Sequence, residues 1–423
     1  MSIDLTKLRN GLTVVTDTMD SVETVSVGIW VGVGTRNERA DVNGIAHLLE
    51  HMAFKGTRRR TARAIAEEIE AVGGYINAYT GREQTVYYAK MLADDLPLAV
   101  DILGDILANS TIEDGELERE RSVVIQEIGQ ARDTPDDLVF DHFQTAAYPA
   151  QAMGRPVLGS AAVVGRLGRG EILEYMRGQY VGTRMVLAAA GRVHHETLVE
   201  LGERAFGGFA RDGTLLAEPA RYEGGELREA RDLEQVHVVL GFRGVPLEDP
   251  DFFTLTVMST LYGGGMSSRL FQEVRERRGL AYSIYSFAAC YRDSGIFGVY
   301  AGTGEKEAGE LLPIVGDQLA DLSVSVGEDE LRRARAQLKA SVLMGFESTS
   351  TRAERLGHNL LTFGRVIPVD EVVQRIEAVD AAAVNRVVRR LLESRPTLAA
   401  IGPTGGLASF ESLERRFAGS SGA

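Results

Sequence analysis

The first half of the chain alternates apolar and polar positions in a pattern that predicts strands, followed by helices. Residues 11–17 and 24–34 are rich in β-branched residues, residues 184–193 are largely apolar, and residues 73–92 form two runs of aromatic and β-branched residues joined by a turn. Runs of this kind are typical of strands and hairpins. Apolar residues at helical spacing predict helices over 94–110 and 115–133, and a further helix that ends near Phe206. This half therefore predicts a sheet with helices packed against it.

The second half repeats this order of elements. Strands are predicted over 235–244, 280–290 and 295–303, and helices over 252–277, 306–322 and 328–348. Between the halves the periodicity is lost, and Gly, Pro and charged residues become frequent. We therefore predict an α+β protein with two homologous domains, each a mostly antiparallel sheet packed with helices. The expected boundaries are a first domain at 1–210, a linker at 211–230 and a second domain at 231–423.

Charge and composition narrow the classes of partner and compartment. The net charge of -14 disfavours nucleic acid or an anionic membrane as the main partner, and it would attract a cationic substrate. The single cysteine, Cys290, excludes an intrachain disulfide framework and favours a reducing compartment. No signal or transit peptide is visible, and no apolar run is long enough to span a bilayer. A cytoplasmic protein without a membrane span is therefore expected.

Polar groups interrupt one apolar segment, residues 43–57, which reads "NGIAHLLEHMAFKGT". Burying such groups without a partner costs roughly 2–7 kcal/mol, so they either pair with one another or bind something. Asn43 is a good N-cap and Gly56 is a good residue to follow a helix C-terminus. On a helix between them, His47, Glu50 and His51 would lie on one face.

The spacing of these three residues matches a zinc site. His47 and His51, four residues apart, can direct two imidazole nitrogens at one Zn²⁺ ion, each at about 2.0–2.1 Å. Glu50 would lie near that ion without binding it, and could take a proton from a metal-bound water. This H-x-x-E-H arrangement is a metalloprotease signature. The alternative is a pair of core histidines hydrogen-bonded to Glu50.

The helix predicted at 115–133 offers a third ligand. Glu120 and Glu127 share one stripe of this helix with apolar residues, and glutamates on an otherwise buried stripe need a cation. The corresponding positions in the second half fall near Ala334 and Ser341, so the carboxylates and the histidines are absent together. One metal site per chain would produce that pattern. The alternative for Glu127 is a salt bridge to a nearby arginine.

The combination of "HLLEHMAFKGT", "GGYINAYTGREQTVYYAKML", "ERERSVVIQEI", "GRPVLGS" and "RERRGLAYSIYSF" resembles the pitrilysin-type zinc peptidases, the inverzincin family M16. The closest resemblance is to the short-chain branch that includes the mitochondrial processing peptidase β subunit and its bacterial relatives. It extends from "LRNGLTVVTD" to about Phe417. The resemblance implies a zinc endopeptidase with one Zn²⁺ per chain and Glu120 as a supporting glutamate. It also implies Glu50 as the catalytic base and three metal ligands, His47, His51 and Glu127.

The resemblance assigns roles to residues outside the cluster as well. Similar family members close as a dimer around a chamber that admits unfolded peptides. An edge strand, along which a substrate peptide adds as a further strand, corresponds to Asn77, Ala78, Tyr79 and Thr80. Two residues of the second domain that stabilise the developing oxyanion correspond to Arg275 and Tyr282. From its own pattern alone, Tyr282 would be interpreted as an aromatic residue of a strand.

Three functions are compatible with these residues. The first is a homodimeric zinc endopeptidase that cleaves unfolded or flexible peptides, with a preference for basic ones. The second is a catalytic subunit that needs a different partner chain, and the third is a non-proteolytic structural subunit of the same fold. The intact cluster argues against the third, and the short glycine loop "YGGGMSSRL" lacks the extended loop of the non-catalytic processing-peptidase α subunit. Surface or capping roles are expected for the other histidines, which are His142, His194, His195, His237 and His358.

Overall fold

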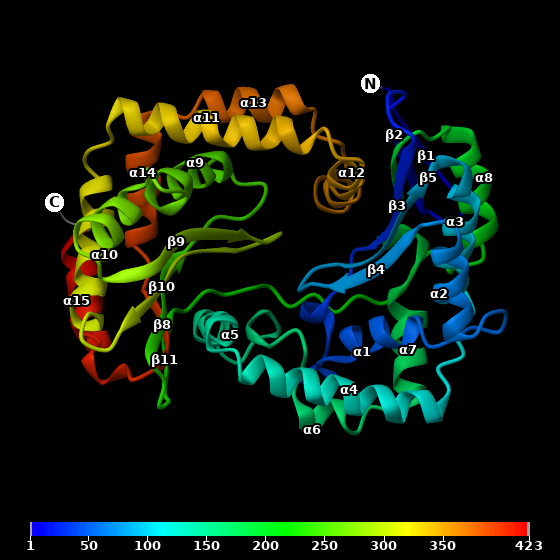
Figure 1. Ribbon diagram of the computed structural model, residues 1–423, viewed down its shortest axis with the longest axis horizontal. Coiled ribbons are helices and arrows are strands. Elements are labelled where there is room, and N and C mark those ends of the chain that lie inside the picture. The colour runs from blue at the N-terminus through cyan, green and yellow to red at the C-terminus, as the bar shows by residue number, and fades with distance from the viewer. Residues whose placement is uncertain (1, 421–423) are drawn as a thin grey trace. The chain divides into compact units, whose positions relative to one another are not determined.

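The computed structural model describes residues 2–420, which divide into two compact units (Figure 1). Unit 1 comprises residues 2–129, 155–218 and 344–367, and unit 2 comprises residues 130–154, 219–343 and 368–420. Each unit therefore takes one short segment from the opposite half of the sequence. The contiguous domains expected from the sequence, 1–210 and 231–423, instead leave residues 130–154 in the first domain and residues 344–367 in the second. We call these two segments exchanged.

Unit 1 is built on a six-stranded sheet, whose described strands follow the order β1-β2-β6-β3-β5-β4. Strands β2 and β6 pair in parallel, and all the other neighbours pair antiparallel. Among the described strands β4 pairs only with β5, so β4 is an edge strand. The bounds are β1 Ser2–Lys7, β2 Thr13–Thr18, β3 Thr24–Val31, β4 Tyr75–Thr80, β5 Thr85–Leu92 and β6 Met185–Gly191.

Alternate side chains of these strands enter two different apolar layers, as the period of two requires. Val27 and Ile29 face the main helical layer with α1, α3 and α8, whereas Trp30 and Val186 face the opposite side with α12. Helices α3 and α8 pack side by side on the first of these faces (Figure 1). The helices of this unit are α1 Ile45–Ala53, α2 Ala62–Ala71, α3 Leu96–Ala108, α4 Asp114–Arg132, α6 Ala161–Val164, α7 Arg169–Gln179, α8 His195–Phe206 and α12 Thr349–Phe363.

Helix α12 belongs to the second half of the sequence but covers the far face of the first sheet. A buried ion pair joins it to β2, with Arg352 Nη1 at 3.0 Å from an Asp17 carboxylate oxygen. A Cβ added at Gly357 would lie 2.2 Å from the Trp30 ring, so the absence of a side chain there lets α12 approach the indole. The helix is therefore an integral part of unit 1.

Unit 2 has a five-stranded sheet, whose described strands follow the order β7-β11-β8-β10-β9. Strands β7 and β11 pair in parallel, and the other neighbours pair antiparallel. One face packs against α9, α10 and α14, and the other packs against α5 from the first half of the sequence. The strands are β7 Gly225–Ala230, β8 Gln235–Arg243, β9 Ala281–Cys290, β10 Gly295–Gly304 and β11 Thr397–Gly402. The helices are α5 Pro135–Ala147, α9 Phe252–Gly263, α10 Ala308–Leu322, α11 Glu328–Gly345, α13 Val369–Glu377, α14 Ala381–Leu392 and α15 Phe410–Ser420.

The two units repeat one plan, and the α+β fold class with two homologous domains is confirmed. Two details differ from the sequence prediction. The helix predicted over 252–277 is divided into α9 and a π-helical segment, Phe271–Arg277, because the intervening glycines interrupt it. The segment expected as a linker contains strand β7. In the part of the chain that the structure describes, no helix has both the length and the apolarity needed to cross a membrane.

Candidate metal centre

Helix α1 presents the two histidines, and a carboxylate from the preceding loop holds its N-terminus. Glu38 accepts hydrogen bonds from the backbone N–H groups of Gly44 at 2.9 Å and Ala46 at 2.8 Å. It also accepts a bond of 2.8 Å from the Asn43 side-chain amide. Burial raises the pKa of Glu38 to about 7, and these hydrogen bonds oppose the shift. The N-cap position is taken by Gly44 at a φ of 98°, so the prediction of Asn43 as N-cap was wrong.

The structure brings His47, His51 and Glu127 together. Glu127 Oε2 lies 3.6 Å from His47 Nε2 and 3.5 Å from His51 Nε2, and one ligand atom from each of the three residues lies within 4.8 Å of the others. Two ligands of a tetrahedral zinc ion, each about 2.0–2.1 Å from it, are about 3.3–3.4 Å apart. The donor set and its spacing therefore fit zinc. Among the described residues, no other group of three or more histidine, cysteine, aspartate or glutamate side chains lies close enough together to hold a metal ion.

The environment of His47 favours its neutral, metal-binding form. Its side chain is 9% exposed, and the Nδ1 atom has no hydrogen-bond partner among the described residues. Burial, and secondarily the neighbouring His51, lowers the pKa of His47 to about 4. At neutral pH the imidazole therefore keeps a lone pair free for a metal.

Glu50 lies on the same face of α1 and is fixed by the edge strand. The hydroxyl of Thr80, at the end of β4, donates a hydrogen bond of 2.6 Å to Glu50 Oε2. Burial raises the pKa of Glu50, while the bond from Thr80 lowers it. The carboxylate is held close to the metal ligands and beside the strand expected to bind peptide. The alternative in which Glu50 pairs with the two histidines has no hydrogen bond to support it among the described residues.

Glu120 lies behind His51. Its Oε2 atom is 3.2 Å from His51 Nδ1, and its Oε1 atom is 2.6 Å from Lys55 Nζ. The Glu120 side chain is 7% exposed, so Lys55 neutralises a nearly buried carboxylate. An acceptor at Nδ1 places the imidazole proton there and leaves Nε2, the nitrogen near Glu127, free as a ligand atom. These contacts are compatible with the supporting role predicted for Glu120.

Comparison with known proteins gives this arrangement a context. The protein-family model described as insulinase (peptidase family M16) matches residues 13–161. The family model of the peptidase M16 inactive domain matches residues 166–338. An uncharacterized zinc protease from Streptomyces coelicolor is 41% identical over 411 residues, which cover 94% of this chain and 89% of the relative. The chain belongs to peptidase family M16. The three candidate metal ligands lie in the region matched by the first family model, which is the half expected to carry them.

Two further relatives and one solved structure are also similar to this chain. A probable mitochondrial-processing peptidase subunit beta from Arabidopsis thaliana is 40% identical over 428 residues, which cover 97% of this chain and 80% of that protein. An uncharacterized zinc protease from Rickettsia felis is 37% identical over 403 residues, covering 95% of this chain and 98% of the relative. A chain of Complex III2 from Candida albicans has the same fold, with a TM-score of 0.86 at 21% identity, and the match covers 98% of this chain and 100% of that one.

The edge strand β4 of this M16 chain combines exposed and anchored residues. Asn77 is exposed, Ala78 is buried, and Tyr79 and Thr80 are half-buried. The Tyr79 hydroxyl donates a hydrogen bond of 2.6 Å to Glu354 on α12. The last two residues of the strand therefore tie it to Glu50 and to α12.

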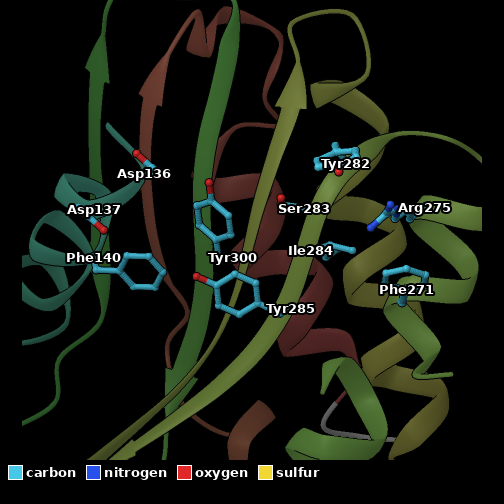
Figure 2. A pocket seen from close by; sticks show the side chains of 10 residues that line it. All are labelled: Asp136, Asp137, Phe140, Phe271, Arg275, Tyr282, Ser283, Ile284, Tyr285 and Tyr300. Atoms are coloured by element: carbon cyan, nitrogen blue, oxygen red, sulfur yellow. The ribbon is translucent and has the colours of Figure 1, made fainter. Parts of the chain in front are cut away.

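The second M16 unit places Arg275 and Tyr282 beside each other. The Arg275 guanidinium carbon lies 4.6 Å from the centre of the Tyr282 ring and 4.7 Å from that of Phe271. Tyr282 is 76% exposed. Both residues line a cavity of about 400 Å³, whose opposite side carries Tyr285 and Tyr300 together with Asp136, Asp137 and Phe140 from α5 (Figure 2). An exposed tyrosine stacked on an arginine differs from an ordinary strand aromatic, which would pack against its sheet.

Sequence reasoning missed three residues of this M16 site. Thr80 was assigned only as part of the edge strand, and its bond to Glu50 depends on how β4 lies beside α1. Lys55 and Glu38 had no assignment, although Lys55 lies within the histidine segment and Glu38 shortly before it. A cationic residue four positions after His51 could have indicated a partner for a buried carboxylate.

Proposed function

We propose that this chain is a zinc-dependent endopeptidase that cleaves unfolded or flexible peptides. The observation that carries the proposal is the convergence of three metal-type ligands, His47, His51 and Glu127, beside a carboxylate that is not one of them. When bound there, zinc supplies a Lewis acid that polarises water and the scissile carbonyl. One ion per chain is expected, because the second half lacks corresponding residues.

In this proposal Glu50 is the general base. It accepts a proton from the attacking water and returns it to the leaving nitrogen, which balances the hydrolysis of the peptide bond. The hydroxyl of Thr80 holds the carboxylate in position at 2.6 Å, so Glu50 does not have to be ordered during the reaction. Its raised pKa makes it a better proton acceptor than an ordinary solvent-exposed glutamate.

Peptide is proposed to bind along the edge strand β4. A peptide strand that pairs with backbone groups of Asn77 to Thr80 would run directly toward Glu50, because Thr80 contacts that carboxylate. Recognition through the backbone accepts many sequences, provided that the substrate is unfolded. The chain's net charge of -14 would favour peptides with basic residues, and Asp136 and Asp137 add two carboxylates to the cavity beside Arg275.

Arg275 and Tyr282 are proposed to stabilise the oxyanion that develops on the scissile carbonyl. The two side chains are stacked and reach the surface of one cavity, so a guanidinium and a phenol are available to one ligand. We propose that a homodimer forms the chamber in which these residues and the metal-bearing half act on one peptide. The expected cytoplasmic location remains a prediction.

Two related functions deserve a direct test. One relative is named as a processing-peptidase subunit beta and one structural neighbour is part of Complex III2, so a role as one subunit of a larger assembly is the second candidate. In that case the purified chain would be inactive alone, either because it lacks a partner or because it performs no chemistry. The complete set of metal-type ligands and the anchored Glu50 favour catalysis.

The test is metal content and peptide cleavage of the purified chain, measured beside Glu50→Gln. Stoichiometric zinc in both proteins, and cleavage that falls by 10²–10⁴-fold in the variant, would support the proposal. Equal cleavage by both proteins would exclude Glu50 as the base. Size-exclusion chromatography with light scattering on the same samples tests the homodimer, and zinc without cleavage by the pure chain would favour the subunit function. Matched basic and acidic peptides of one length, compared at low and high salt, test the charge preference.

A further inference from the structure

Besides the cavity beside Arg275 in unit 2, a second hollow lies in unit 1, where three helices end. None of the three proposed metal ligands lines it. The C-terminal turns of α3, α7 and α8 surround it, together with Arg58 and residues 208–210, which follow α8. Its volume is about 590 Å³, which lies within the 300–1,000 Å³ typical of small-molecule sites. Its apolar lining includes Leu107, Leu173, Met176 and Phe209.

The polar lining of this hollow is strongly cationic. Arg58, Arg177 and Arg204 all line it, and no acidic residue does so among the described residues. None of these three guanidinium groups forms a hydrogen bond or ion pair with another side chain in the part of the chain that the structure describes. The neighbouring Arg59 and Arg60, in contrast, both bond Asp101. All three residues are exposed, so a ligand in the hollow can reach their guanidinium groups, in a chain whose net charge is -14.

Compensation of helix dipoles does not account for this cluster. Arg177 and Arg204 lie in the last turns of α7 and α8, where a cation is favourable. Each helix C-terminus carries only about half an elementary charge, so three helix ends offset roughly half of the three positive charges. Backbone donors already serve these ends, since Tyr180 N–H bonds the Met176 carbonyl and Gly207 N–H bonds the Glu203 carbonyl. A net positive charge therefore remains.

We propose that this hollow binds a small amphipathic anion, with a carboxylate or phosphate head among the three arginines and an apolar body against Leu107, Leu173 and Met176. Guanidinium groups form charge-assisted and bidentate hydrogen bonds with both kinds of head. A simple inorganic anion would leave the apolar part of the hollow unfilled, so the proposed ligand also carries an apolar body. The site is separate from the residues of the proposed peptidase function, and binding does not depend on that function.

The test uses the full chain and four probes in isothermal titration calorimetry. Octanoate and octyl phosphate carry the two kinds of head, octyl glucoside carries the same chain without charge, and acetate carries a head without the chain. Saturable binding of one equivalent of octanoate or octyl phosphate, with much weaker binding of the other two probes, is the expected result. The tighter of the two charged probes identifies the head group. Octyl glucoside binding as tightly as both of them would overturn the proposal.

Variants locate the binding. The triple variant Arg58→Gln, Arg177→Gln and Arg204→Gln should bind the preferred probe at least about tenfold more weakly, as expected for the loss of charge-assisted bonds. The matched control changes three exposed arginines of the same unit that have carboxylate partners, Arg63→Gln, Arg119→Gln and Arg192→Gln. Equal weakening in both triple variants would mean that only net charge matters and would overturn the site. Single Arg→Gln variants, each with circular dichroism equal to that of the wild type, provide the same comparison if the triple variant unfolds.

Discussion

Replacing Glu120 by Gln is expected to weaken zinc binding while leaving the fold intact. The carboxylate contacts His51 Nδ1 at 3.2 Å through one oxygen and Lys55 Nζ at 2.6 Å through the other. An amide has almost the same shape, but it carries no charge and offers one acceptor oxygen in place of two. The change therefore tests the electrostatic role of Glu120 with little change in packing.

The expected loss follows from these two contacts. Hydrogen bonds to charged groups contribute about 1.5–3 kcal/mol and neutral ones about 0.5–1.5 kcal/mol, so the bond to His51 loses about 1–1.5 kcal/mol. The amide oxygen can serve either His51 or Lys55. When it serves Lys55, the imidazole is no longer held with its proton on Nδ1, which costs additional binding energy. A total of about 1.4–2.7 kcal/mol corresponds to a 10- to 100-fold lower zinc affinity.

The assay is a competition titration of the metal-free protein with zinc and a chromophoric chelator, and it requires no peptide cleavage. Glu118→Gln is the matched control, because Glu118 is exposed on the same helix and the variant loses the same charge. Thermal unfolding of the metal-free variants checks that the fold is retained. An affinity of Glu120→Gln within about twofold of the wild type, or an equal loss in Glu118→Gln, would refute the supporting role of Glu120.

Three further predictions concern the same site. Thr80→Val should lower kcat about tenfold, because the variant loses the hydrogen bond to Glu50. Its zinc content should stay unchanged, and Thr80→Ser should regain activity. An unchanged kcat would contradict the proposal that Thr80 positions the base. In metal-free protein, protonation of His47 should lower the free energy of unfolding by up to about 3 kcal/mol as the pH falls from 6.5 toward 4. The reason is that the imidazole takes up its proton at a higher pH in the unfolded chain than in the folded one. Urea unfolding of His47→Gln should lack this pH-dependent loss of stability. Mixing inactive Glu50→Gln with inactive Arg275→Ala should restore part of the cleavage if Arg275 of one chain serves the metal half of another. A mixture that stays inactive despite demonstrated subunit exchange would exclude that arrangement.

Helical spacing was sufficient to predict which side chains gather at the candidate metal centre. The separation of His47 and His51 by four residues fixes their common face on α1, and the stripe that carries Glu120 and Glu127 follows from the same period. The predicted strands and most helices were also correct, because the helices have an apolar stripe and the strands have short apolar runs. Local patterns of this kind depend on neighbours that are close in sequence.

Contacts between distant segments could not be predicted in the same way. The apolar stripe of α12 shows that the helix packs on something, but not that it covers the sheet of the first half. The capping of α1 by Glu38 was missed because Asn43 has the better local propensity, while the carboxylate arrives from a separate turn. The bond from Thr80 to Glu50 likewise depends on the packing of β4 beside α1.

The exchange of α12 also sets an order of events during synthesis. The strands of the first sheet leave the ribosome well before residues 349–363, so the face around Trp30 must wait for much of the second half to be translated. During that interval Asp17 lacks Arg352 and, like the apolar side chains around Trp30, stays open to solvent. The nascent first half is therefore a candidate for chaperone binding, and the gene resists division into two independently folding halves.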